Sequence, residues 1–325
     1  MSIYKYVSQE GALRYLRTWA LRITPPDQFN DPFEMRPLVE LSPEDMLEQA
    51  SSIVIEQMKI EFEKAFKNGI PGDQAGQLHD LISALARYCM REMSQQDEDR
   101  FLEEIKPLAA PNFAEHIAAF RIHFDAKYKE AIEAARAQAP AFSKVAQSAM
   151  HRVLPQVIGV LCLSGSNKHP LMWSHYTDSH KGALLEFDEN APCFNRKRSE
   201  DDDFGILHRV WYADSRPKLF KEKSADALVG LALTKALEWS YEQELRILWP
   251  LKLADRTIES DGKLIHLIDV PATALRSITI GCRADPTFLP DVLRALIDAK
   301  PTQRIGVRVA SLDEEAFSLN YQEVC

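Results

Sequence analysis

Residues 39–157 form a long stretch of helical character that interrupts a chain otherwise rich in strand patterns. The stretch is rich in Ala, Glu, Lys, Gln and Met, and its apolar residues recur with the period of an α-helix. Prolines and an Asn-Gly pair divide it into expected helices at residues 43–67, 74–93, 98–108, 112–138 and 142–157. We therefore predict a helical insertion with a bundle core, and we assign it no chemistry.

The parts on either side of the insertion carry short β-branched and aromatic runs that are bounded by turn residues. Strands are expected at residues 3–7, 20–24, 158–164, 183–188, 206–212, 245–248, 264–270, 275–281, 305–310 and 317–319, and helices at 9–18, 170–176, 225–238 and 288–299. This pattern predicts an α+β fold. One mixed sheet is built from residues 1–38 and 158–325 as a discontinuous core domain, into which residues 39–157 are inserted.

Composition excludes several classes of protein. The net charge of −9 gives no overall basic field that would attract nucleic acid. The five cysteines are scattered and lack CxxC spacing, which favours reduced thiols over a disulfide framework or a cysteine zinc site. There is no signal-peptide pattern at the N-terminus and no apolar run as long as a membrane span. We expect a cytoplasmic protein without a membrane partner.

Two carboxylates, Glu242 and Glu244, stand where a strand is expected to begin, after the predicted helix 225–238. The two-residue period of a strand would point both side chains to the same side. Two carboxylates on the same side, two residues apart, raise the pKa of at least one of them, so that one can act as an acid and the other as a base. The alternative is a solvated strand edge on which Glu244 and Arg246 are surface partners. The sequence leaves both interpretations open.

A second cluster of candidates precedes Gly182, and consists of Trp173, His175 and Tyr176. Aromatic rings beside a tight turn can stack on a planar ligand, and glycine lets the backbone approach it closely. The alternative is that Trp173 and Tyr176, which are three residues apart on a helix, pack into the core. Asn30 lies in an Asn-Asp-Pro turn, which by itself explains the presence of this residue.

His169, His175 and His180, with the carboxylates of Glu186 and Asp188, are candidate metal ligands. Imidazole and carboxylate groups suit zinc or manganese. The spacing matches no compact ligand motif, and we expect the three histidines not to converge on one point. The chain also has no glycine-rich phosphate loop and no GxSxG nucleophile turn.

Three blocks of sequence together resemble a bacterial family of unknown function, DUF2971. The first block comprises residues 4–6, 21–25 and 29–34, the second residues 171–176, 180–182 and 185–188, and the third Lys235 with residues 239–247. The resemblance covers the chain outside the helical insertion. It supplies no activity.

The layout is also similar, more distantly, to the ADP-ribosyltransferase fold. That resemblance implies NAD as a substrate, held at the first strand by Tyr4 or Lys5, with its nicotinamide stacked on Tyr176 or Trp173. It implies that Glu244 stabilises the positive charge of an oxocarbenium-like transition state, while Glu242 accepts the proton of the nucleophile. Lys5 stands where the family has His or Arg, and the family's Ser-Thr-Ser strand is absent.

Three functions follow as hypotheses. The first is an NAD-using ADP-ribosyltransferase or NAD glycohydrolase, an effector in bacterial defence or a toxin, with a protein or nucleic acid as acceptor. The second is a non-enzymatic sensor or interaction module whose insertion binds a partner. The third is a metal-dependent hydrolase or nuclease. We predict that one pocket is lined by Tyr4, Lys5, Asn30, Trp173, His175, Tyr176, Glu242 and Glu244.

Overall fold

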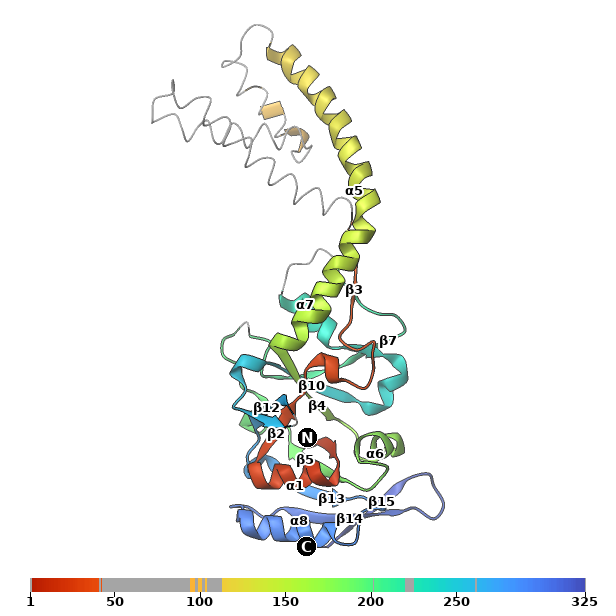
Figure 1. Ribbon diagram of the computed structural model, residues 1–325, viewed down its shortest axis with the longest axis vertical. Coiled ribbons are helices and arrows are strands. Elements are labelled where there is room, and N and C mark those ends of the chain that lie inside the picture. The colour runs from red at the N-terminus through yellow and green to blue at the C-terminus, as the bar shows by residue number, and fades with distance from the viewer. Residues whose placement is uncertain are drawn as a thin grey trace, which may run out of the picture. The chain divides into compact units, whose positions relative to one another are not determined.

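The computed structural model describes residues 2–40, 113–200, 202–219, 225–260 and 262–324, together with a few positions between 42 and 103 (Figure 1). The chain divides into two compact units, Met1–Leu38 with Gln147–Cys325, and Val39–Ala146. The second unit ends at Ala146, whereas the sequence places the end of the insertion at residue 157. The predicted helices at 43–67, 74–93 and 98–108 lie outside the described residues, apart from a few isolated positions.

One helix, α5 (Phe113–Val157), replaces the two helices predicted at residues 112–138 and 142–157. The predicted break at Pro140 is therefore wrong. Proline removes one backbone hydrogen bond and strains the preceding turn. Strong helix formers, including several alanines and Arg136, surround it and continue the helix on both sides. Within the described part of the chain, every helix is too short or too polar to cross a membrane.

An eight-stranded sheet forms the centre of the first unit, in the order β15-β14-β13-β5-β1-β4-β10-β6. Its strands are β1 (Ser2–Val7), β4 (Ile158–Ser164), β5 (Ala183–Asp188), β6 (Leu207–Arg209), β10 (Glu244–Pro250), β13 (Leu275–Ile280), β14 (Gly306–Leu312) and β15 (Leu319–Glu323). Strands β13 and β14 pair in parallel, and the other neighbours are antiparallel. The prediction of an α+β chain with a mixed sheet that contains both β1 and β10 is confirmed.

Both faces of this sheet are covered by packed side chains. Alternate residues of β1 point to opposite faces, so they join different clusters. Ile3 belongs to the main core, where α1 (Gln9–Thr18) packs beside α8 (Phe288–Ala299). Ser8 caps α1 by accepting a hydrogen bond from the backbone N–H of Gly11. Tyr6 packs instead with Met172 and other residues under the short helix α6 (Pro170–Tyr176).

A separate three-stranded sheet takes two strands that were expected in the main one. It has the order β11-β12-β2, with β11 (Arg256–Ser260), β12 (Lys263–Asp269) and β2 (Ala20–Ile23). The expectation of a single sheet is wrong here, because β2 pairs along β12 and meets the main sheet only through a bridge from Thr24 to Val160. Pro25 and Pro26 follow and have no N–H groups with which to extend that contact.

The helix predicted at residues 225–238 ends early, which matters for the site. Helix α7 (Ala225–Ala232) stops where the Thr234 side chain donates to the Gly230 carbonyl, and the strand β9 (Thr234–Ala236) follows. Strand β9 pairs in parallel with β7 (Trp211–Ala213), so tertiary pairing overrides the helical propensity of this segment. The strand predicted at 206–212 is divided at Val210 into β6 and β7.

The remaining described elements are short. They are the strands β3 (Leu38–Val39) and β8 (Lys218–Leu219) and the 3₁₀ helices η1 (Pro26–Gln28), η3 (Pro192–Phe194), η4 (Leu237–Glu242), η5 (Leu251–Leu253) and η6 (Ala272–Ala274). The last strand, predicted around 317–319, begins only at Leu319, and Phe317 is fully exposed in the turn before it.

Candidate functional site

A cavity of about 210 Å³ opens where strands β1 and β4 part from one another. These neighbours pair at a single position, Tyr4 with Ser164, whereas β1 pairs with β5 along its whole length and β4 pairs fully with β10. The cavity is lined by Tyr4, Lys5, Tyr6, Thr24, Gln28, Phe29, Asn30, Asp31, Glu34, Cys162, Leu163, Ser164, Met172, Tyr176, Lys235, Trp239, Glu242 and Glu244.

The three blocks of sequence that were singled out meet in this cavity. Of the residues predicted to line one pocket, the structure places six in its wall, namely Tyr4, Lys5, Asn30, Tyr176, Glu242 and Glu244. They come from the first strand, from the turn after β2, from α6, from the end of η4 and from the start of β10. The sheet thus brings together positions from both ends of the sequence, on either side of the insertion.

Trp173 and His175 do not line the cavity, so this part of the prediction is wrong. Trp173 is fully buried in the core, where its indole N–H donates to the Tyr321 hydroxyl at 3.1 Å. His175 is exposed. The cause is the helical period of α6: Met172 and Tyr176, four residues apart, both face the cavity, and residues between them point elsewhere. The core interpretation therefore holds for Trp173, whereas Tyr176 both packs against that core cluster and lines the cavity.

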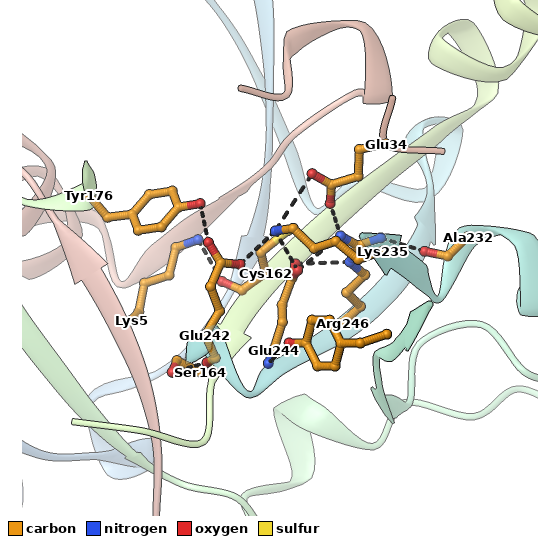
Figure 2. A network of polar contacts seen from close by, with 11 residues as sticks. Lys5, Glu34, Cys162, Ser164, Tyr176, Ala232, Lys235, Glu242, Glu244 and Arg246 are labelled. Carbon is orange, nitrogen blue, oxygen red and sulfur yellow. Dashed lines mark hydrogen bonds and ion pairs between the residues drawn. The ribbon is translucent and has the colours of Figure 1, made fainter. Parts of the chain in front are cut away.

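A buried amine links the carboxylates of the cavity (Figure 2). Lys235, on β9, places its Nζ 2.6 Å from Oε2 of Glu242 and 3.0 Å from Oε2 of Glu244. A third carboxylate, that of Glu34, lies 3.7 Å away. The ring of Trp239 lies 5.0 Å from the same nitrogen, close enough for a cation–π contact. One cation therefore holds together acidic residues from two separate segments, the turn after β2 and the junction of η4 with β10.

Arg246 completes the network beneath the cavity. Its Nε and one terminal nitrogen each donate to a carboxylate oxygen of Glu244 at 2.9 Å, which is a bidentate pair. It also pairs with Glu34 and donates to the carbonyl of Ala232 at 2.5 Å. Arg246 is 0% exposed and Glu244 is 5% exposed. The alternative of a solvated strand edge is therefore wrong, although it paired the correct two side chains.

Glu242 and Glu244 approach each other through a turn and not through the period of a strand. Glu242 ends the 3₁₀ helix η4, Gln243 has a left-handed backbone with φ of 46°, and Glu244 begins β10. The hydroxyl of Ser164 donates to the Glu242 carbonyl at 2.6 Å. The backbone N–H of Glu244 donates to the Tyr212 hydroxyl at 2.7 Å. These bonds hold the backbone of both residues in place.

Burial and charge perturb the titration of this cluster. Burial raises the pKa of Glu244, with Lys235 opposing the rise and Glu242 adding to it. Burial lowers the pKa of Lys235, but the attraction of Glu244 and Glu242 outweighs burial and leaves this pKa raised. Burial and the Glu242 carboxylate raise the pKa of Tyr176. At neutral pH, Lys235 is thus a cation, and the Tyr176 hydroxyl donates to Oε1 of Glu242 at 2.6 Å.

Sequence reasoning assigned no role to several residues that build the site. Glu34 and Lys235 were present in the first and third blocks, and Trp239 opens the run in the third. Their proximity in sequence to the other candidate residues could have identified them. The predicted helix at 225–238 concealed it, because a lysine in an amphipathic helix normally points into solvent. Only the pairing of β9 with β7 turns Lys235 into the cavity.

The histidines considered as metal ligands contact different aromatic rings. His169 stacks on Tyr241 with ring centres 4.7 Å apart, and His180 stacks on Trp173 at 6.4 Å. His175 meets the edge of another ring. Glu186 and Asp188 belong to a different network with Ser2, Ser277, Arg276 and Arg308. Among the described residues, no group of three or more His, Cys, Asp or Glu side chains is arranged to hold a metal ion.

Comparison with known proteins supports one of the resemblances. No curated protein and no solved structure matches the chain, so the likeness to ADP-ribosyltransferases stays a prediction. The model of one family matches residues 172–247, from α6 to β10. This segment contains Tyr176, Lys235, Glu242 and Glu244, whereas Tyr4 and Lys5 lie outside it. Residues 172–247, which are less than half of the chain, are similar to the family described as a protein of unknown function, DUF2971.

Proposed function

We propose that the cavity binds the nicotinamide end of NAD and that the protein cleaves the bond between nicotinamide and ribose. ADP-ribose then passes to an acceptor or to water. The observation that carries the proposal is the Glu242 carboxylate, which is 2% exposed and stands in the cavity wall between Tyr176 and Lys235.

Glu242 is suited to the charge that develops in such a reaction. Breaking an N-glycosidic bond passes through an oxocarbenium-like state, and a nearby carboxylate stabilises the positive charge on the sugar. Nicotinamide leaves as a neutral molecule, so its departure needs no proton donor. The bonds from Tyr176 and Lys235 hold both oxygens of Glu242 in place before substrate enters, so little reorganisation is needed during the reaction.

The geometry favours an exchange of the roles that the ADP-ribosyltransferase resemblance implies. Both oxygens of Glu244 accept hydrogen bonds from Arg246, and one also accepts from Lys235. A carboxylate that is clamped in this way has little charge left for a substrate. We therefore assign the stabilising role to Glu242. Glu244 anchors Lys235, which in turn orients Glu242.

The charge balance of the cluster favours a cationic ligand. Glu34, Glu242 and Glu244 give three negative charges when ionised, and Lys235 and Arg246 give two positive ones, which leaves a net charge of −1. The nicotinamide ring of NAD carries a positive charge, as does the sugar in the transition state. In a buried site the attraction is strong, because the effective dielectric constant is well below that of water.

The size and lining of the cavity set limits on the ligand. Its volume of about 210 Å³ is smaller than the roughly 300–1,000 Å³ of pockets that enclose drug-sized ligands. It can therefore take one ring and a sugar, with the adenosine half of a dinucleotide outside it. The rings of Tyr4, Phe29, Tyr176 and Trp239 line the wall and offer faces on which a planar base can stack.

The test is release of nicotinamide from NAD by the wild-type protein and by Glu242→Gln. Removal of this charge should reduce the rate about a hundredfold or more. Glu238→Gln is the matched control, because Glu238 is an exposed carboxylate on the same 3₁₀ helix. That variant should keep the wild-type rate. Equal rates for Glu242→Gln and the wild type would exclude the assigned role.

One observation favours a second candidate, a ligand-sensing module without chemistry. The carboxylates of the network are already paired with Lys235 and Arg246, and a buried polar network that is fully satisfied serves to rigidify a fold. Under this alternative the cavity binds a nucleotide and the insertion transmits binding to a partner. Saturable NAD binding without nicotinamide release, in the presence of protein and nucleic-acid acceptors, would select this function.

A further inference from the structure

Lys5 differs from the other lysine of the cavity in its bonding. Its Nζ donates to the backbone carbonyl of Cys162 at 2.6 Å, across the opening between β1 and β4. Among the residues that the structure describes, no carboxylate forms an ion pair with it. Lys235, by contrast, contacts three carboxylates. The Lys5 amine is therefore held in position without a counter-ion in direct contact.

The position of Lys5 leaves its nitrogen available to a ligand. The residue lines the cavity beside Tyr4 and Tyr6, which are its neighbours on β1. A neutral amine has two N–H groups and one lone pair. The carbonyl of Cys162 takes one N–H group, so the lone pair has no protein donor in that contact. Lysines of this kind, desolvated in a pocket, are the ones that form Schiff bases with carbonyl compounds.

We propose that Lys5 is an imine-forming amine and that the cavity takes an aldehyde, specifically the open-chain form of a ribose. The inference deepens the proposed function, and the ligand class rests on that function. Cleavage of the N-glycosidic bond by water leaves ribose C1 as a hemiacetal. That hemiacetal is in equilibrium with an aldehyde. The site thus captures the product of its own reaction, or a related sugar from solution.

The reaction balances without any further reagent. The Nζ lone pair forms a bond to the aldehyde carbon, and the carbonyl electron pair moves to oxygen. A first proton then passes from the nitrogen to this oxygen, giving a carbinolamine that keeps one N–H group. Glu242, which lines the same cavity, takes a proton from the nitrogen and returns it to the hydroxyl group. Water leaves and the carbon–nitrogen double bond forms. An amine and an aldehyde give an imine and water, and nothing is oxidised or reduced.

The electrostatic surroundings support the reactivity of Lys5 at neutral pH. Burial lowers its pKa below the ordinary value for lysine. Cys162 on β4, Glu244 on β10 and Glu242 on η4 oppose this effect, and Arg22 on β2 adds to it. The balance leaves the pKa lowered. The fraction of neutral amine is therefore larger than for an exposed lysine, by about tenfold for each unit of pKa.

The test traps the imine in the full-length wild-type protein. Glyceraldehyde and sodium cyanoborohydride are added at pH 7, and the rate of modification of each lysine is read by peptide mass mapping. Lys252, an exposed lysine of η5, is the internal control. Lys5 should be modified faster than Lys252, because a larger fraction of its amine is neutral. Reaction at Lys5 no faster than at Lys252 would overturn the proposal. Lys5→Arg keeps a long side chain that can donate to the Cys162 carbonyl, and it should lose only the fast adduct.

A second arm identifies the ligand class. ADP-ribose in place of glyceraldehyde should give a single adduct at Lys5, and it should slow the reaction of glyceraldehyde there. Absence of both effects would exclude an open-chain ribose as the ligand. The outcome is separable from that of the proposed function. Lys5 can react in a protein that does not turn over NAD, and a protein that releases nicotinamide without labelling at Lys5 refutes only the imine.

Discussion

Replacement of Lys235 by methionine removes the cation that joins the three carboxylates of the cavity. Its Nζ lies 2.6, 3.0 and 3.7 Å from oxygens of Glu242, Glu244 and Glu34. Loss of one partner from a buried ion pair costs about 3–5 kcal/mol of stability, because a charge stays buried without compensation. Arg246 still pairs with Glu244 and Glu34, so Glu242 alone is left without a cation. We therefore expect the lower limit, about 3 kcal/mol at pH 7.

The same substitution should make stability depend on pH. The pKa of Glu244 is already raised by burial, and Lys235 opposes the rise. Removal of the Lys235 cation raises the pKa of Glu244 further. Between the unfolded pKa of about 4.3 and the raised folded value, the folded chain binds more protons than the unfolded chain. Stability of the variant therefore falls as pH rises through that window, and acidification recovers part of the loss.

Urea unfolding followed by tryptophan fluorescence measures both effects. All five tryptophans lie in the unit that contains the site, so the signal reports on that unit. Lys252→Met is the matched control and should change stability by no more than about 0.5 kcal/mol, because Lys252 is exposed. A loss below about 1 kcal/mol for Lys235→Met, or a loss independent of pH, would refute the assignment of Lys235 as the central cation.

Two further substitutions test parts of the site and its support. Tyr176→Phe removes the hydroxyl that donates to the Glu242 carboxylate. A hydrogen bond to a charged group contributes about 1.5–3 kcal/mol, so the midpoint of urea unfolding should fall. An unchanged midpoint would contradict this bond. Gly182→Ala places a Cβ 2.0 Å from the Val7 carbonyl oxygen and should lower stability by about 1–3 kcal/mol or more in urea unfolding. The control Gly230→Ala has open space around it in α7, and it should be neutral or stabilising in the same assay.

Local patterns were sufficient to predict the elements whose pairing and propensity agree. Helix α8 and strands β4 and β5 have the bounds that their periodicity predicted, because each has a continuous apolar face with turn residues at its ends. Helix α7 does not, because its final segment has helical propensity but pairs with a distant strand as β9. Such pairing is decided by contacts between residues far apart in sequence, which local periodicity does not contain.

The candidate site was predictable to the extent that candidate residues were polar or aromatic and stood beside turns. Glu242, Glu244 and Tyr176 were found in this way. Trp173 was misplaced, because an aromatic residue on a short helix has the same sequence signature whether it faces a core or a cavity. Lys235 was overlooked, since a buried lysine is distinguished only by the carboxylates around it, and one of these, Glu34, is about 200 positions away in the sequence.

Calorimetric titration of the wild-type protein with NAD tests the central claim most directly, because nucleotide binding in this cavity underlies every step proposed. We predict saturable binding at or below millimolar concentration, which Trp239→Ala weakens through loss of a ring from the cavity wall. Glu242→Gln should still bind NAD, since it keeps the shape of the side chain. No detectable binding to the wild type at millimolar NAD would contradict the account.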